Sequence, residues 1–172
     1  MQPIDGTNAL SAGVWYHVAV TLNGNTGILY VNGVALATSN NITLNPSSLG
    51  NTTNNWLGRS EFSNPYLSGA IDEFRIYSMA LSPAEIAATD ALGPSVTLST
   101  NCPPMNLTMA DTKLTLSWPL ECAGFAVQSC TNPTLGNWQT VASQAPQIVT
   151  NQWQVSLPIS GSNPATFYRL LK

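Results

Sequence analysis

Aromatic residues and neutral amides gather in one short stretch of the chain, between residues 54 and 66. Sugar-binding sites combine flat aromatic surfaces, which stack on the apolar face of a pyranose ring, with amides that hydrogen-bond its hydroxyls. The stretch therefore predicts a ligand-binding set of amides and rings: Asn54, Asn55, Trp56, Phe62, Asn64 and Tyr66. The alternative is that Trp56 and Tyr66 pack into the protein core.

His17 is the one histidine of the chain and lies in a β-prone run that starts near Val14. A strand histidine of this kind is typically structural, hydrogen-bonded beneath a sheet. Catalysis by His17 with Asp72 as its partner is the alternative, yet no GxSxG sequence nominates a nucleophile. A single histidine also excludes a multi-histidine zinc site within one chain.

Paired carboxylates of the glycosidase type are not indicated. Asp72 and Glu73 are neighbours, so in a strand their side chains point to opposite faces and cannot flank one glycosidic bond. The other acidic residues are scattered along the chain. These patterns favour a protein that is not an enzyme.

The chain is rich in neutral polar residues and poor in charge. Of its 172 residues 44% are hydrophobic and 8% charged, and the net charge is −3. A nucleic-acid binder needs a clustered basic face, so that class is excluded. No run is long and apolar enough to span a membrane. The N-terminus lacks the features of a secretory signal, but the composition indicates an extracellular or cell-surface protein.

Three cysteines, Cys102, Cys122 and Cys130, lie in the C-terminal half, and their spacing matches no zinc motif. At most one disulfide can form within the chain, and the sequence does not choose the pair.

The N-terminal part reads as β-structure followed by one helix. Asn32-Gly33 between two β-prone runs is a strong hairpin signal and predicts a three-stranded meander over about residues 14–38. Further strands are predicted at 42–44, near 56–59 and at 67–77, where alternation puts Asp72 on one face with Phe74 and Ile76. Ser82-Pro83-Ala84-Glu85 is typical of a helix start and predicts a helix over about 83–90.

Gly93-Pro94 breaks the chain, and we place a domain boundary there, between residues 1–93 and 94–172. Seven short alternating runs follow: VTLST, KLTLSW, FAVQSC, WQTVAS, QIVT, WQVSLPI and ATFYRLL. Leu114, Leu116 and Trp118 share one face. This spacing is typical of a small immunoglobulin or fibronectin III-type sandwich. The predicted fold class is therefore all-β.

Four separated blocks carry a resemblance to a known family: 15–21 (WYHVAVT), 27–33 (GILYVNG), 57–60 (LGRS) and 69–77 (GAIDEFRIY) with 80–86 after it. In order and spacing, residues 10–90 resemble the second half of a laminin-G-like, concanavalin A-like jelly roll. The tail is similar to C-terminal sandwich modules of secreted bacterial proteins.

The resemblance implies two further expectations. The match covers only the family's second half, so the first domain is expected to be a truncated jelly roll that a second chain completes, giving a homo-oligomer. A family carboxylate in the region of Asp72 can help to hold a structural calcium ion, which takes six to eight oxygen ligands. The alternative for Asp72 is bonding to backbone N–H groups or pairing with Arg59 or Arg75.

Together these observations predict a non-catalytic binding module, with polysaccharide or another glycan as its partner, from a larger secreted bacterial protein. One alternative is a metal-assisted hydrolase whose site, including His17 and Asp72, is assembled between chains. Another is a structural spacer or adhesion domain.

Overall fold

The computed structural model describes residues 4–6, 9–102, 104–159 and 165–172. The chain forms two compact units: Met1–Val31 with Ala35–Leu81, and Asn32–Val34 with Ser82–Lys172. The predicted domain boundary at residues 93 and 94 therefore lies one helix further along the chain than the main division between the units. In the described residues the strands form three antiparallel sheets and there is one α-helix, so the prediction of an all-β protein is confirmed.

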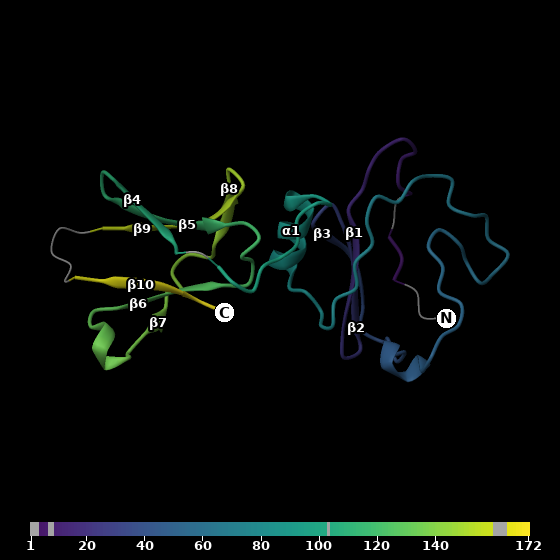
Figure 1. Ribbon diagram of the computed structural model, residues 1–172, viewed down its shortest axis with the longest axis horizontal. Helices are drawn as coiled ribbons and strands as arrows, with labels where there is room; N and C mark the ends of the chain where they lie inside the picture. The colour runs from purple at the N-terminus through teal and green to yellow at the C-terminus, as the bar shows by residue number, and fades with distance from the viewer. Residues whose placement is uncertain (1–3, 7–8, 103, 160–164) are drawn as a thin grey trace. The chain divides into compact units, whose positions relative to one another are not determined.

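The first sheet is a meander of three strands: β1 (Val18–Asn23), β2 (Thr26–Val31) and β3 (Val34–Ser39). Asn32 and Gly33, between β2 and β3, have φ of 48° and 74°. Positive φ at both central positions is the turn geometry that matches the twist of paired strands. The predicted meander is confirmed, and Figure 1 shows it at the purple end of the colour scale.

The three later strands predicted in the first unit do not form. The structure has no strand at residues 42–44, 56–59 or 67–77. A short 3₁₀ helix, η1 (Pro46–Leu49), lies between the first two of these segments. A single strand-like bond, from the N–H of Leu67 to the C=O of Gly58 at 2.8 Å, links the last two segments. β-propensity acts through neighbouring strands and burial. The sheet in this unit consists of β1, β2 and β3, and none of the three segments is paired with a strand of that sheet.

The helix α1 (Pro83–Leu92) confirms the sequence-based prediction. The Glu85 N–H donates to Ser82 Oγ at 3.3 Å, and the Ser82 N–H donates to Glu85 Oε2 at 2.9 Å, which completes the capping box. This exchange satisfies backbone N–H groups that the first turn of a helix leaves without partners. Gly93 ends the helix with φ of 72°.

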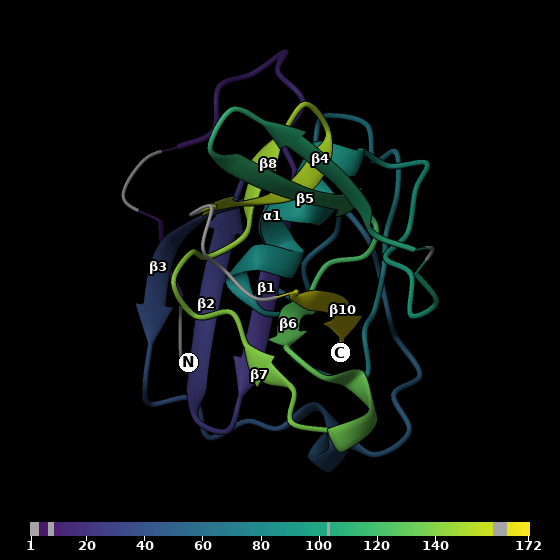
Figure 2. The same ribbon diagram turned by 90° about the vertical axis from the view of Figure 1, so that its left-hand side faces the viewer.

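The second unit contains two sheets, which Figures 1 and 2 show as stacked layers. One sheet has the strand order β4-β5-β9-β8 and the other β10-β6-β7. The strands are β4 (Asn106–Ala110), β5 (Lys113–Pro119), β6 (Ala126–Cys130), β7 (Gln139–Thr140), β8 (Gln147–Val149), β9 (Gln152–Pro158) and β10 (Phe167–Leu171), with a 3₁₀ helix, η2, at Pro133–Leu135.

Six of the seven predicted runs contain a strand, and one prediction was wrong. Residues 96–100 (VTLST) form no strand. Instead the N–H of Ser99 donates to the C=O of Glu121 at 2.7 Å. On one side β5 pairs with β4, a strand that the sequence did not predict and whose five residues are all exposed. Leu107 and Met109 alternate with polar residues along β4, but both are exposed, so this strand adds no side chain to the core.

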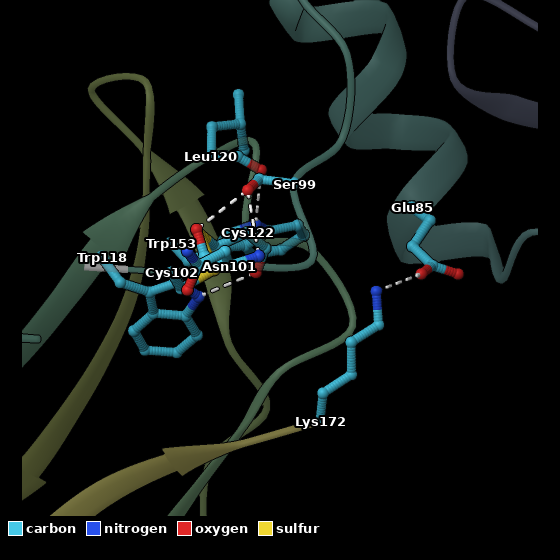
Figure 3. The surroundings of a disulfide bond; sticks show 9 residues. All are labelled: Glu85, Ser99, Asn101, Cys102, Trp118, Leu120, Cys122, Trp153 and Lys172. Atoms are coloured by element: carbon cyan, nitrogen blue, oxygen red, sulfur yellow. Dashed lines mark hydrogen bonds and ion pairs between the residues drawn. A yellow bond between two sulfur atoms is a disulfide. The ribbon is translucent and has the colours of Figure 1, made fainter. Parts of the chain in front are cut away.

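The core of the second unit fills the space between its sheets. Leu116, Trp118, Trp153 and Val155 are all almost fully buried, and Trp118 faces Trp153 across β5 and β9. The indole N–H of Trp118 donates to the C=O of Cys122 at 3.2 Å, and the indole N–H of Trp153 donates to the C=O of Leu120 at 3.0 Å. The two buried N–H groups are thus satisfied by one turn, as the dashed lines of Figure 3 show.

That turn is also held by the disulfide, which joins Cys102 to Cys122, while Cys130 is a buried free thiol. The structure thereby supplies the pairing that the sequence left open. At the same end of the unit the Nζ of Lys172 lies 3.9 Å from Oε1 of Glu85, as drawn in Figure 3.

Candidate functional site

The candidate site is built on an irregular loop of the first unit, residues 59–66. The bond between the N–H of Leu67 and the C=O of Gly58 closes the two ends of this loop. Gly58 has φ of 72°, in the left-handed region that favours glycine. Inside the loop Ser60 Oγ accepts hydrogen bonds from the Phe62 N–H at 3.1 Å and from Asn64 Nδ2 at 3.3 Å. Ser60 therefore stabilises the loop through hydrogen bonds to two other loop residues.

The loop encloses an open hollow of about 590 Å³. Its lining combines two aromatic rings and an amide with hydroxyls and one charge of each sign: Arg59, Ser60, Glu61, Phe62, Ser63, Asn64, Pro65 and Tyr66. Phe62 is 67% exposed and Tyr66 is 68% exposed. Rings this exposed contribute little to a core but are available to a ligand.

Arg59 lies between two aromatic rings. Its guanidinium carbon is 3.9 Å from the centre of the Trp56 ring and 5.5 Å from the centre of the Tyr66 ring. A guanidinium over an aromatic face is attracted by the ring quadrupole, by about 0.5–1 kcal/mol at an exposed site. Among the residues that the structure describes, Arg59 makes no hydrogen bond or ion pair.

The structure brings four of the six predicted ligand-binding residues together. Phe62, Asn64 and Tyr66 line the hollow, and Trp56 borders it through Arg59. Trp56 is 40% exposed, so the alternative, that Trp56 and Tyr66 pack into the core, does not describe the structure.

Asn54 and Asn55 are both exposed and lie outside the lining of the hollow. The side chain of Asn55 is engaged locally, since its Oδ1 accepts from Thr52 Oγ1 at 2.8 Å. Its Nδ2 donates to the C=O of Thr52 at 3.3 Å. Asn55 therefore belongs to a local turn next to the hollow.

From the sequence, Arg59 is expected only as one of two possible partners for Asp72. Its position three residues after Trp56 and seven before Tyr66 was the available signal. In an irregular loop no fixed period says where a side chain points, so the stacking could not be read from the spacing.

Asp72 is exposed, and so are Phe74 and Ile76, with which it was predicted to share a face. That prediction was wrong because residues 67–77 form no strand. Arg75 pairs instead with Glu73, through Nε at 2.6 Å and Nη2 at 2.7 Å. The hydrogen-bonded Glu73 carboxylate raises the pKa of the Arg75 guanidinium above its ordinary value.

His17 is half-buried and immediately precedes β1. In the described part of the chain, no three or more His, Cys, Asp or Glu side chains are grouped to hold a metal ion. Asp72 and His17 therefore do not belong to such a group there. Nor does any described helix have the length and apolar character to cross a membrane.

A second arginine is stacked on a tryptophan, in the second unit. The guanidinium carbon of Arg169 lies 4.3 Å from the centre of the Trp138 ring. In contrast to Arg59, Arg169 has a hydrogen-bond partner, because Nε and Nη2 both donate to Gln128 Oε1, at 2.9 and 2.8 Å.

The chain is similar to a known protein family and to a solved structure. The model of the concanavalin A-like lectin/glucanases superfamily matches residues 2–87. No curated protein matches the chain. A crystal structure of an S-layer domain-containing protein (residues 221–444) from Clostridium thermocellum is 43% identical, with a TM-score of 0.42. The match covers 48% of this chain and 42% of that one, so this chain spans less than half of the solved structure.

Proposed function

Because the chain belongs, through residues 2–87, to the concanavalin A-like lectin/glucanases superfamily, we propose that it is a non-catalytic carbohydrate-binding module. The ligand is a polysaccharide or glycan, bound at the hollow formed by residues 59–66 with Trp56 at its border. The module belongs to a larger bacterial protein that acts outside the cell or at its surface. Family membership alone does not fix this function; the residues of the loop support it.

The observation that carries the proposal is the exposure of Phe62 and Tyr66 around an open hollow that also presents hydroxyl and amide groups. An aromatic ring that faces solvent offers its face to the C–H groups of a pyranose. The Ser60, Ser63 and Asn64 side chains offer donors and acceptors for sugar hydroxyls.

The lining of the hollow favours binding over hydrolysis. Glycosidases use a pair of carboxyl groups on the two sides of the scissile bond. The hollow is lined by one carboxylate, Glu61. A ligand held there would meet no second acid to complete the pair.

We also propose that the second unit is an immunoglobulin-like sandwich that accompanies the binding unit. Two observations support this: the stacking of a four-stranded on a three-stranded antiparallel sheet, and the strand order β4-β5-β9-β8 in the larger sheet. In the A-B-E-D sheet of an immunoglobulin domain the second strand likewise lies between the first strand and one that is not consecutive with it.

Self-association of the chain is part of the same proposal. Val18 and Val20 alternate along β1 and are 51% and 63% exposed, which leaves aliphatic side chains of one sheet face in water. Leu36 of β3 is also exposed. Exposed apolar patches of this kind mark association surfaces, and a second copy of the chain would cover them.

Calcium binding at Asp72 remains a prediction. Asp72 is exposed, and no cluster of three or more acidic, His or Cys side chains includes it in the described ranges. The proposed function does not depend on the ion.

Affinity electrophoresis in native gels that contain a polysaccharide tests the proposed function. The panel should hold neutral and acidic polymers. Retardation of the wild-type chain by one of them, lost in the Trp56→Ala/Tyr66→Ala variant, is expected. Trp15→Ala is the matched control, since Trp15 is an exposed tryptophan of the same unit outside the hollow. Equal retardation of the double variant and the wild type contradicts the proposal.

A further inference from the structure

The two arginine–tryptophan stacks in the described residues differ in the hydrogen bonds that their guanidinium groups make. Arg169 stacks on Trp138 and directs two N–H groups at Gln128, so part of its hydrogen-bonding edge is used inside the protein. Arg59 stacks on Trp56 and faces Tyr66, but in the described residues nothing accepts its N–H groups. Arg59 is itself exposed and lines the hollow.

This arrangement decides which part of the site can meet a ligand. A guanidinium 3.9 Å from the ring centre covers that face of Trp56, so a sugar cannot stack there while Arg59 stays in place. Arg59 also lines the hollow beside the exposed rings of Phe62 and Tyr66, and its N–H groups have no acceptor among the described residues. Stacking also holds the guanidinium, so less side-chain freedom is lost when it binds a partner.

We infer that the ligand is an acidic sugar, the uronate unit of a polysaccharide, with its carboxylate held by Arg59. This inference rests on the proposed carbohydrate-binding function and names its ligand class. The N–H fork of a guanidinium matches the two oxygens of a carboxylate, and such charge-assisted pairs are about twice as strong as neutral hydrogen bonds. The sugar ring would contact Tyr66 or Phe62.

Glu61 sets a limit on this interaction, because its carboxylate lines the same hollow. Its negative charge opposes an anionic ligand, and so does the net charge of −3 on the whole chain. Attraction must therefore come from the local contact with Arg59 and not from the long-range field of the protein. It follows that removal of the charge of Glu61 strengthens binding of an acidic sugar.

The test measures the dissociation constant of the full chain for polygalacturonate and for its methyl-esterified form, which has the same backbone without the charge. The wild type is expected to prefer the acid form. Arg59→Gln is expected to lose at least about tenfold in affinity for the acid form and to bind the ester as before. Arg59→Lys keeps the charge without the fork and should fall between the two.

Two further variants distinguish a specific effect of Arg59 from a general loss of folding. Arg169→Gln is the matched control, because it removes the other stacked arginine, and it should bind like the wild type. Glu61→Gln should bind the acid form more tightly, a gain that misfolding cannot mimic.

Equal affinity of the wild type for the acid and ester forms, with no effect of Arg59→Gln, overturns the inference while the proposed function stands. An equal loss of affinity for the acid and the ester forms in Arg59→Gln also overturns it, since Arg59 would then contribute to binding without recognising the carboxylate charge. Tighter binding of dextran sulfate than of polygalacturonate overturns the assignment to a carboxylate. Failure of the proposed function has a separate signature, which is binding that survives Trp56→Ala/Tyr66→Ala.

Discussion

The guanidinium carbon of Arg59 lies 3.9 Å from the centre of the Trp56 ring, within a segment that has no strand or helix. The contact fixes two side chains next to a hollow whose backbone is closed by the bond from Leu67 to Gly58. The site therefore has some order without belonging to the sheet. Sites on loops can bind ligands when a few contacts hold the loop in one shape.

Loss of the disulfide should destabilise the second unit. The bridge joins residues 20 apart in sequence, and closing a loop of that size removes about 3 kcal/mol of entropy from the unfolded chain. Cys102→Ala/Cys122→Ala should lower the free energy of unfolding by about that amount. Denaturant titration followed by tryptophan fluorescence measures it, because Trp118 and Trp153 bond to the same turn. Cys130→Ala, which keeps the bridge, is the control for cysteine removal. Its unfolding should remain sensitive to a reducing agent, and an insensitive unfolding curve would contradict the assigned pair.

Removal of the helix cap should cost a small, measurable stability. Ser82 Oγ accepts from the Glu85 N–H, and loss of such a cap costs about 1 kcal/mol with alanine but only a few tenths with glycine. Urea titrations of Ser82→Ala and Ser82→Gly should show this difference. Ser95→Ala, at an exposed serine shortly after the helix, is the control. Equal stability of Ser82→Ala and the wild type would show that the cap contributes nothing.

Self-association should depend on the aliphatic side chains of β1. We expect a light-scattering mass above that of one chain at micromolar concentration, and a lower mass for Val18→Ser/Val20→Ser. Met109→Ser removes an exposed apolar side chain of β4 in the second unit and should leave the mass unchanged. A wild-type mass equal to one chain would refute self-association.

Calcium, if it binds at Asp72, should stabilise the folded chain. A ligand that binds only the folded state adds about 2.7 kcal/mol at a concentration one hundred times its dissociation constant. Thermal unfolding in excess calcium should then occur at higher temperature than in EDTA, and Asp72→Asn should remove the difference. Asp111→Asn, an exposed acid in the second unit, should retain it. Identical wild-type transitions in calcium and EDTA would exclude a stabilising site.

Sequence predicted those parts of the fold that local chemistry determines. Asn32-Gly33 favours positive φ at two successive positions, and Ser82 with Glu85 closes a helix end, whatever surrounds them. Alternation along β5 predicted that Leu114, Leu116 and Trp118 share one face, and the structure buries all three in the core.

The remaining features depend on contacts between distant residues. Residues 67–77 alternate like a strand, but a strand needs another beside it, which the local pattern does not reveal. The choice of Cys122 over Cys130 depends on how the turn after β5 approaches Cys102. At the site, composition indicated the aromatic rings and amides. It did not show that Arg59 would cover Trp56, since side-chain direction in a loop has no period.

Nuclear magnetic resonance of the tryptophan indole N–H groups tests the central claim most directly. The chain has five tryptophans, and Trp56→Phe identifies the signal of Trp56. Titration of the ¹⁵N-labelled protein with oligogalacturonate should shift the Trp56 signal and leave those of the buried Trp118 and Trp153 in place. A titration that leaves the Trp56 signal unmoved, or that shifts only Trp15 or Trp138, would contradict a sugar-binding site at Arg59 and Trp56.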